Sequence, residues 1–249
     1  NYVSVSDNQL YLIDLAAGTA RKLTDSSNPV GYDGLKFAPD GRLWAASDYG
    51  SDVKRLGVVN LETSLFEPLV DEKIWDITDF DISPDGRWIA FEVNHAGRSL
   101  LKFYDTQSGQ IRVADSVPAG VISGVKFAPW GELGITLNSN RTGSDAYSIN
   151  PQTLTVTRWT RSEAGGLDTA ANVAPELVEI TSFDGERMSG YLYRPDSARH
   201  KGKRPLIIHI HGGPEGQAKP HFLGRDNYLI NELGIALFYP NVRGSTGFG

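Results

Sequence analysis

The stretch best suited to chemistry is His-Gly-Gly-Pro-Glu-Gly-Gln, residues 211–217, which directly follows an apolar run. Gly212 and Gly213 lack Cβ atoms, so their backbone N–H groups can approach a ligand oxygen closely. Such donors suit an oxygen that gains negative charge during a reaction, as the oxyanion of acyl transfer does. A tight turn without chemistry would use the same Gly-Gly-Pro residues. The motif by itself therefore leaves both interpretations open.

The side chains beside the two glycines are weaker candidates. Pro214 has no N–H and fixes its own φ, which helps to hold the shape of the loop. Glu215 would repel an oxyanion, but it could contact the amino end of a substrate. His211 is not expected to be a catalytic base, because α/β-hydrolase triads run Ser, Asp, His along the chain and no nucleophile elbow precedes it.

Strands and a helix alternate around this motif. The run 206–210 is short and continuously apolar, which is typical of a strand buried on both faces. Residues 222–233 have the spacing of an amphipathic helix, and Gly234 ends it. The expected apolar face of this helix contains Phe222, Tyr228, Leu229 and Leu233. Residues 235–239 predict another buried strand, followed by a second glycine-rich segment. In open α/β sheets, active sites lie just beyond the carboxyl ends of the strands, as these glycine-rich segments do.

A hairpin precedes these elements. Val178 and Ile180 alternate with polar residues, and Asp184-Gly185 is a strong turn signal. The returning strand covers 190–194. Hairpin, strand, helix and strand together predict the first part of an α/β-hydrolase domain over residues 176–249.

Residues 1–160 repeat instead. Three aligned stretches contain Pro39, Pro84 and Pro129, which are 45 residues apart. Alternating apolar and polar residues predict four short strands per repeat, and such a unit is typical of a β-propeller blade. We expect complete blades at about 35–70, 80–115 and 125–160. Residues 1–24 would supply most of another blade without its first strand, so the fold class is a partial β-propeller of four-stranded blades followed by the first part of an α/β-hydrolase domain.

Aromatic and charged residues of the repeats have different expected roles. Trp44, Trp88 and Phe91 are predicted to lie in the blade cores. Polar loops at 94–99 and 138–145 would join the second and third strands, and there His95, Arg98 and Arg141 are candidates for contact with a substrate. Solvated loops without a function are the alternative. Residues 161–175, rich in Gly and Ala, predict a linker between the two domains.

Composition excludes several classes of function. The 249 residues contain no cysteine, which excludes disulfides, thiolate metal sites and a cysteine nucleophile. A net charge of −6 argues against a nucleic-acid-binding surface, and the apolar runs are too short to span a membrane. We expect no metal and no cofactor. A cytoplasmic location is favoured, with the periplasm and secretion left open. The chain opens on Asn rather than Met, so we expect the native start to lie upstream.

The whole order of elements resembles the prolyl oligopeptidase family of serine peptidases, in particular its acylaminoacyl-peptidase and dipeptidyl-peptidase-like members. In that family a propeller caps an α/β-hydrolase domain. The most specific part is HGGPEGQ followed by Asn-Val-Arg-Gly-Ser-Thr-Gly-Phe-Gly at 241–249. The resemblance implies that Gly212 and Gly213 border an oxyanion hole, with the Gly213 N–H as one donor. Arg243 matches a family arginine, which we expect to organise its loop as a buried guanidinium.

The sequence departs from the family at the nucleophile. It contains no Gly-x-Ser-x-Gly, and Ser245 lies between glycines at the wrong spacing. Because family members carry Ser, Asp and His beyond this point, we expect no triad residue in this chain and no activity from it alone. Its partners would be the rest of the propeller and of the catalytic domain, in the same polypeptide or a second chain.

The resulting hypothesis is a fragment of a serine peptidase that cleaves short peptides by acyl-enzyme chemistry, with the propeller restricting access. An esterase or amidase on the same scaffold is one alternative, because a fold does not determine the substrate. A non-enzymatic propeller that binds a partner is another, although it leaves residues 176–249 without a role.

Overall fold

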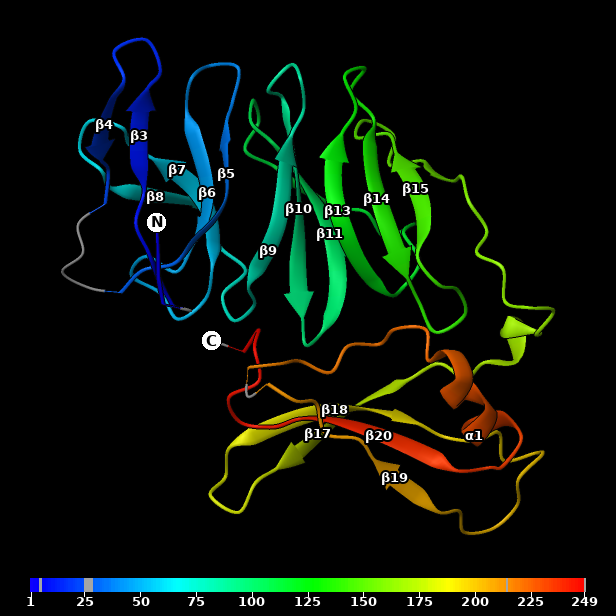
Figure 1. Ribbon diagram of the computed structural model, residues 1–249. Helices are drawn as coiled ribbons and strands as arrows, with labels where there is room; N and C mark the ends of the chain where they lie inside the picture. Colours follow the sequence, from blue (N-terminus) through cyan, green and yellow to red (C-terminus); the bar gives the residue numbers. More distant parts are fainter. Residues whose placement is uncertain (5, 25–28, 214, 249) are drawn as a thin grey trace.

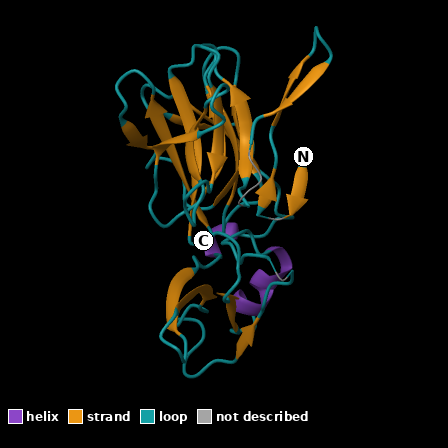
Figure 2. Cartoon of the chain, turned by 90° about the vertical axis from the view of Figure 1, so that its left-hand side faces the viewer, coloured by secondary structure: helices purple, strands orange, loops and turns teal. Residues whose placement is uncertain are grey.

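The computed structural model describes residues 1–4, 6–24, 29–213 and 215–248. Within them, three four-stranded antiparallel sheets stand side by side above a fourth sheet of mixed direction (Figure 1). The side view separates the same two groups of strands and leaves the N-terminal strands projecting from the upper one (Figure 2). We call the three upper sheets the blade unit, and the lower sheet with its short helix the C-terminal unit.

Each sheet of the blade unit contains one sequence repeat. The first sheet has β5 (Tyr32–Phe37), β6 (Leu43–Ser47), β7 (Arg55–Val59) and β8 (Phe66–Val70). The second has β9 (Ile77–Ile82), β10 (Trp88–His95), β11 (Arg98–Asp105) and β12 (Ile111–Val113). The third has β13 (Val121–Phe127), β14 (Leu133–Asn138), β15 (Asp145–Ile149) and β16 (Val156–Arg158). The prediction of four antiparallel strands per repeat is confirmed.

The proline turns of the repeats are equivalent, as predicted. In each sheet the glycine two residues after the proline, Gly41, Gly86 or Gly131, donates its N–H to the carbonyl of the residue before the proline, at 2.8–2.9 Å. All three glycines have a positive φ, a conformation that residues with a Cβ atom rarely adopt. The turn chemistry therefore ends the first strand of every blade at the same point.

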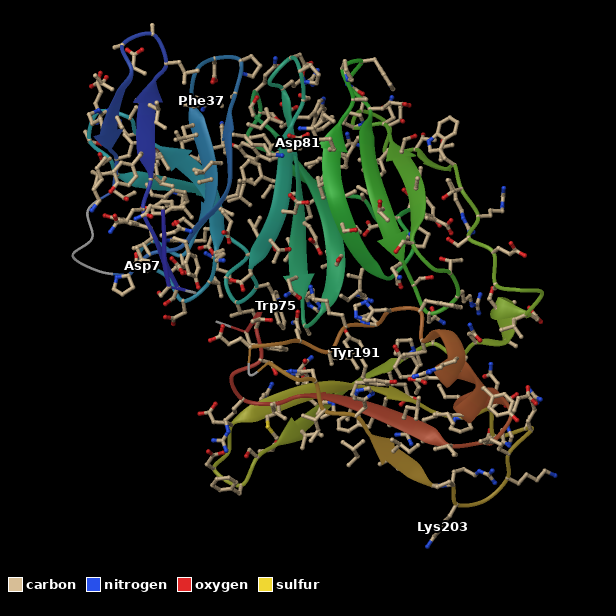
Figure 3. All side chains as sticks on the ribbon, viewed as in Figure 1. Asp7, Phe37, Trp75, Asp81, Tyr191 and Lys203 are labelled. Atoms are coloured by element: carbon tan, nitrogen blue, oxygen red, sulfur yellow. The ribbon has the colours of Figure 1, made fainter. Side chains whose placement is uncertain are left out.

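Apolar packing and one buried carboxylate join neighbouring blades. Trp44, Trp88 and Phe91 are buried in the cores between sheets, as predicted. Asp81 occupies the same repeat position as Lys36 and Lys126, and its carboxylate lies 2.8 Å and 3.5 Å from their ammonium nitrogens. Figure 3 labels Asp81 on the middle blade. Because its two partners come from the blades on either side, this carboxylate links all three.

The N-terminal segment differs from the prediction of one incomplete blade. It forms two separate pairs of strands, β1 (Tyr2–Ser4) with β2 (Asp7–Asn8) and β3 (Tyr11–Asp14) with β4 (Thr19–Lys22). Leu10 and Leu23 pack against the first blade, and the Asn8 side chain pairs with the Tyr32 backbone at 2.9–3.0 Å. These contacts turn β2 toward the blade and away from the β3–β4 ladder.

The C-terminal unit is a mixed sheet with the order β17-β18-β20-β19. Its strands are β17 (Glu176–Thr181), β18 (Arg187–Tyr193), β19 (Leu206–Ile208) and β20 (Ala236–Asn241). The hairpin at Asp184-Gly185 is confirmed. β19 pairs in parallel with β20, but it is an edge strand with exposed side chains. The prediction that this run is buried on both faces is therefore wrong for the chain described.

The helix of the C-terminal unit is shorter than the periodicity predicts. A 3-10 turn, η2 (Gly224–Asp226), leads into α1 (Asn227–Asn231). Ile230 packs in the core with Tyr191, Tyr193 and Leu237, whereas two residues of the predicted face, Tyr228 and Leu233, are exposed. The face that covers β18 and β20 is thus rotated from the predicted one. No helix among the described residues has the length and apolarity to cross a bilayer.

Candidate functional site

The glycine-rich loop 211–218 is tied to the C-terminal unit by backbone and amide hydrogen bonds. The Ala218 N–H donates to Asn241 Oδ1 at 2.7 Å, and Asn241 Nδ2 donates back to the Ala218 carbonyl at 3.1 Å. The Thr246 N–H donates to the Gly216 carbonyl at 3.0 Å. Asn241 is the buried last residue of β20, so the loop is held by the end of a strand and by the segment that follows it.

His211 of this loop contacts Ser245 of the second glycine-rich segment, 241–249. His211 Nε2 lies 2.8 Å from Ser245 Oγ, and His211 Nδ1 lies 3.1 Å from the Gly212 carbonyl. A nucleophile and a base have this spacing, but only 6% of Ser245 is exposed, and the second ring nitrogen faces a carbonyl rather than a carboxylate. We therefore interpret the pair as a hydrogen bond that holds the two glycine-rich segments together.

Gly213 adopts a conformation that requires glycine. Its φ is 150°, and a Cβ atom added there would lie 2.4 Å from the Glu215 nitrogen and 3.0 Å from the Gly216 nitrogen. A Cβ added to Gly212 would meet no atom within 4 Å. Among the described residues, neither glycine donates its N–H to a partner. Pro214, whose influence on the loop was predicted, lies outside the described residues, and Glu215 is exposed.

A hairpin of the blade unit contacts this loop. The predicted polar loop 94–99 is instead a tight turn at Ala96-Gly97, because β10 and β11 stay paired up to His95 and Arg98. The Tyr191 hydroxyl donates to the Ala96 carbonyl at 2.9 Å. Figure 3 shows Tyr191 on the lower sheet where it faces the blade unit. Positive φ values at Ala96 and Gly97 give the turn the twist of paired strands.

A cavity of about 340 Å³ lies beside this hairpin, between the two units. Its walls are formed by His95, Arg98, Ala119, Gly120, Asn140, Ala174, Pro175, Leu177, Tyr191 and Pro220. Arg98, a predicted contact residue, thus lines a cavity and Arg141 does not, although both residues are exposed. Burial lowers the pKa of His95, and the positive charge of Arg98 adds to this effect. The cavity therefore carries positive charge from Arg98 and a His95 ring that favours its neutral form.

Arg243 differs from the expected buried guanidinium. Its side chain is half exposed and pairs with the Asp184 carboxylate in the β17–β18 turn, with the guanidinium over the Phe183 ring at 5.2 Å. No hydrogen bond from this guanidinium to backbone occurs among the described residues. Arg243 joins the segment after β20 to the β17–β18 turn, but it does so through side chains at the surface, where the guanidinium remains hydrated.

Several residues of this network are absent from the sequence prediction. Asn94, Tyr191 and Asn241 each lie at or within a strand, where the alternating pattern marks only burial. Gln217 ends the first glycine-rich motif, Asn241 begins the second, and Asn94 lies in the predicted polar loop 94–99, but none of these signals says which residue each would contact. Their partners are remote in the chain, so local spacing contains no trace of the contacts.

Comparisons with known proteins agree with this architecture. No protein-family model matches the chain. It is 35% identical to dipeptidyl aminopeptidase BIII of Pseudoxanthomonas mexicana over 303 residues, covering 97% of this chain and 43% of that protein. The solved puromycin hydrolase superposes with a TM-score of 0.80 at 20% identity, over 93% of this chain and 36% of that one. For prolyl oligopeptidase B from Galerina marginata the TM-score is 0.84 at 15% identity, over 98% and 36%.

The chain thus spans less than half the length of the proteins it matches. The two structural matches bear on the fold, and the sequence match extends over nearly all of this chain. Together with the repeated blades and the glycine-rich loop, they support the resemblance seen in the sequence: over nearly its whole length the chain is similar to a dipeptidyl aminopeptidase, and its fold is similar to that of prolyl oligopeptidases.

Proposed function

We propose that the protein carrying this chain hydrolyses short peptides by acyl-enzyme chemistry, and that loop 211–218 supplies half of its oxyanion hole. The observation that carries the proposal is Gly213. Its backbone conformation excludes any Cβ atom, and its N–H has no partner among the described residues. A preorganised donor of this kind stabilises the charge that develops in a tetrahedral intermediate.

The nucleophile is proposed to lie in the part of the parent protein that this chain does not span. Gly-x-Ser-x-Gly is absent from the 249 residues, and the relatives are more than twice as long as the matched region. The exposed apolar edge at Leu206, Ile207 and Ile208 supports this proposal, because further strands of an α/β sheet would cover it. The blade unit lies against the oxyanion loop and would limit access to short peptides.

Labelling with a fluorophosphonate tests this function directly. The full-length protein should react at one serine outside residues 1–249, and this chain expressed alone should remain unlabelled and inactive. Ser245→Ala in the full-length protein should still be labelled, because the Ser245 hydroxyl is buried against His211. Mass spectrometry locates the adduct, and a panel of dipeptide amides, tripeptides and esters separates a peptidase from an esterase. An adduct on Ser245 would contradict the proposal.

Arg98 and Arg141, both candidates for substrate contact, should now behave differently. Arg98→Ala in the full-length protein removes a positive charge from the cavity, so KM for short peptides with a free carboxylate should rise about 10-fold, as the loss of a charge-assisted hydrogen bond does. Arg141→Ala is the matched control and should leave KM within about 2-fold, because Arg141 is an exposed charge that does not line the cavity. Steady-state kinetics measure both, and equal effects would rule out a role for the cavity.

A further inference from the structure

We infer that Asn94, on the blade unit, is a positioning residue for the oxyanion loop, so that the shape of the loop depends on docking of the blades. The inference rests on the proposed function. Asn94 is 4% exposed. Its Nδ2 donates to Gln217 Oε1 at 2.9 Å, and Gln217 Nε2 donates to Asn94 Oδ1 at 3.3 Å. Two amides that pair in both directions define the orientation of each other.

Asn94 is itself held in place by its own hairpin. Its Oδ1 also accepts the Gly97 N–H at 2.8 Å, which ties the side chain to the turn at the tip. A Cβ atom on Gly97 would lie 2.8 Å from the Ala218 carbonyl, so the backbone at the tip of the hairpin packs directly against the backbone of the loop. A Cβ atom on Gly247 would lie 2.3 Å from Asn94 Nδ2. The amide therefore fits between both glycine-rich segments of the C-terminal unit.

The other bonds of the loop come from its own unit. Asn241 holds Ala218 and Thr246 holds Gly216, whereas Gln217 is held from the blade unit. Gln217 lies four residues after Gly213, so we infer that the bond to its side chain contributes to the position of the Gly213 N–H. If the two units separate, Gln217 loses its partner and the donor loses part of its support. Positioning errors of about 1 Å at a reacting centre cost about 100-fold in rate.

A purely structural role for the pair would be a contribution to docking of the two units. A second asparagine allows the two roles to be separated. Asn138 is the last residue of the second strand of the next blade, a position close to that of Asn94 in its own blade. Asn138 Oδ1 accepts the Phe222 N–H at 2.6 Å. This bond also joins the units, but it reaches the chain beyond the oxyanion loop. Asn138→Ala is therefore the matched control for Asn94→Ala.

The experiment uses the full-length protein with Asn94→Ala, Gln217→Ala, the double variant and Asn138→Ala. Asn94→Ala and Gln217→Ala should each lower kcat by about 10- to 100-fold with KM within about 3-fold, because a displaced donor weakens only the transition state. The kcat of the double variant should be no lower than that of the single variant with the larger loss, since both substitutions remove the same interaction. Gln217→Glu keeps the acceptor for Asn94 Nδ2 and should recover part of the loss. Asn138→Ala should leave kcat within about 3-fold.

Hydrogen exchange at residues 211–218 provides a readout that does not need activity. Exchange there should rise in Asn94→Ala and Gln217→Ala but stay at the wild-type level in Asn138→Ala. Equal losses of kcat in all three single variants, or unchanged exchange in the loop, would overturn the inference. A wild-type protein that cleaves no peptide and takes no fluorophosphonate defeats the proposed function instead, and in that case the exchange data alone decide whether Asn94 positions the loop. Because Gln217→Ala leaves the bond between Asn94 and Gly97 intact, the test survives if Asn94→Ala fails to fold.

Discussion

Gly213→Ala in the full-length protein should lower kcat by about 10²- to 10³-fold, the cost of losing one oxyanion donor. The new Cβ atom would lie 2.4 Å from the Glu215 nitrogen. That neighbour is backbone and not a flexible side chain, so the loop must change shape to admit the methyl group. The Gly213 N–H remains in the molecule but points elsewhere. KM should change little, because the donor acts on the transition state more than on the bound substrate.

Gly212→Ala is the control for this change. A Cβ atom there meets open space, and φ at Gly212 is not in the region that favours glycine, so its loss of kcat should be much smaller. Steady-state kinetics with one peptide substrate compare the two variants, and thermal unfolding confirms that both are folded. Turnover by Gly213→Ala within a few-fold of the wild type would mean that His-Gly-Gly-Pro is only a turn.

Asp145→Ala should destabilise the full-length protein by about 2–4 kcal/mol, somewhat below the usual cost of breaking a buried ion pair. The Asp145 side chain is fully buried, and its partner Arg158, at 2.7 Å, is 31% exposed. The same carboxylate accepts hydrogen bonds at 2.8 Å from the Thr160 hydroxyl and the Ser162 N–H. These contacts attach the chain leaving the last blade to the start of β15, and alanine removes the acceptor from these donors.

The loss of stability caused by Asp145→Ala should depend on pH. Burial by itself raises the pKa of Asp145, but hydrogen bonds from Thr160, Ser162 and Arg158 outweigh it and hold the pKa below its ordinary value. A carboxylate with a lowered pKa stabilises the folded state above its unfolded pKa of about 4, and this stabilisation disappears as the pH falls through the folded pKa. The difference between Asp145→Ala and the wild type should therefore be largest at neutral pH and shrink under acid conditions.

Urea unfolding at neutral and acid pH measures both effects. The control is Glu176→Ala, which breaks an ion pair to Arg194 at 3.0 Å between side chains that are 54% and 62% exposed. It should change stability by less than about 1 kcal/mol, as exposed pairs do. A difference for Asp145→Ala that stays constant with pH would contradict an ionised carboxylate with a lowered pKa, and one as small as that of Glu176→Ala would contradict the stabilising role of its contacts.

The sequence by itself determined the local architecture. The spacing of Pro39, Pro84 and Pro129 located equivalent turns, and alternating residues located the four strands of each blade. Asp184-Gly185 located the hairpin of the C-terminal unit. These features depend on side-chain alternation and on turn residues, whose physical effects extend over only a few neighbours. The positive φ of Gly213, by contrast, was not predicted from the sequence and is a finding of the structure.

Only the tertiary structure decided which polar groups meet. Asn94 and Gln217 are 123 residues apart, and His211 and Ser245 belong to separate glycine-rich segments, so no periodic pattern relates them. The structure also placed Arg98 in a cavity and left Arg141 outside it, although both lie in polar stretches that look alike. A long-range hydrogen bond depends on how two rigid units dock, and docking is determined by the summed packing of many side chains rather than by the residues that form the bond.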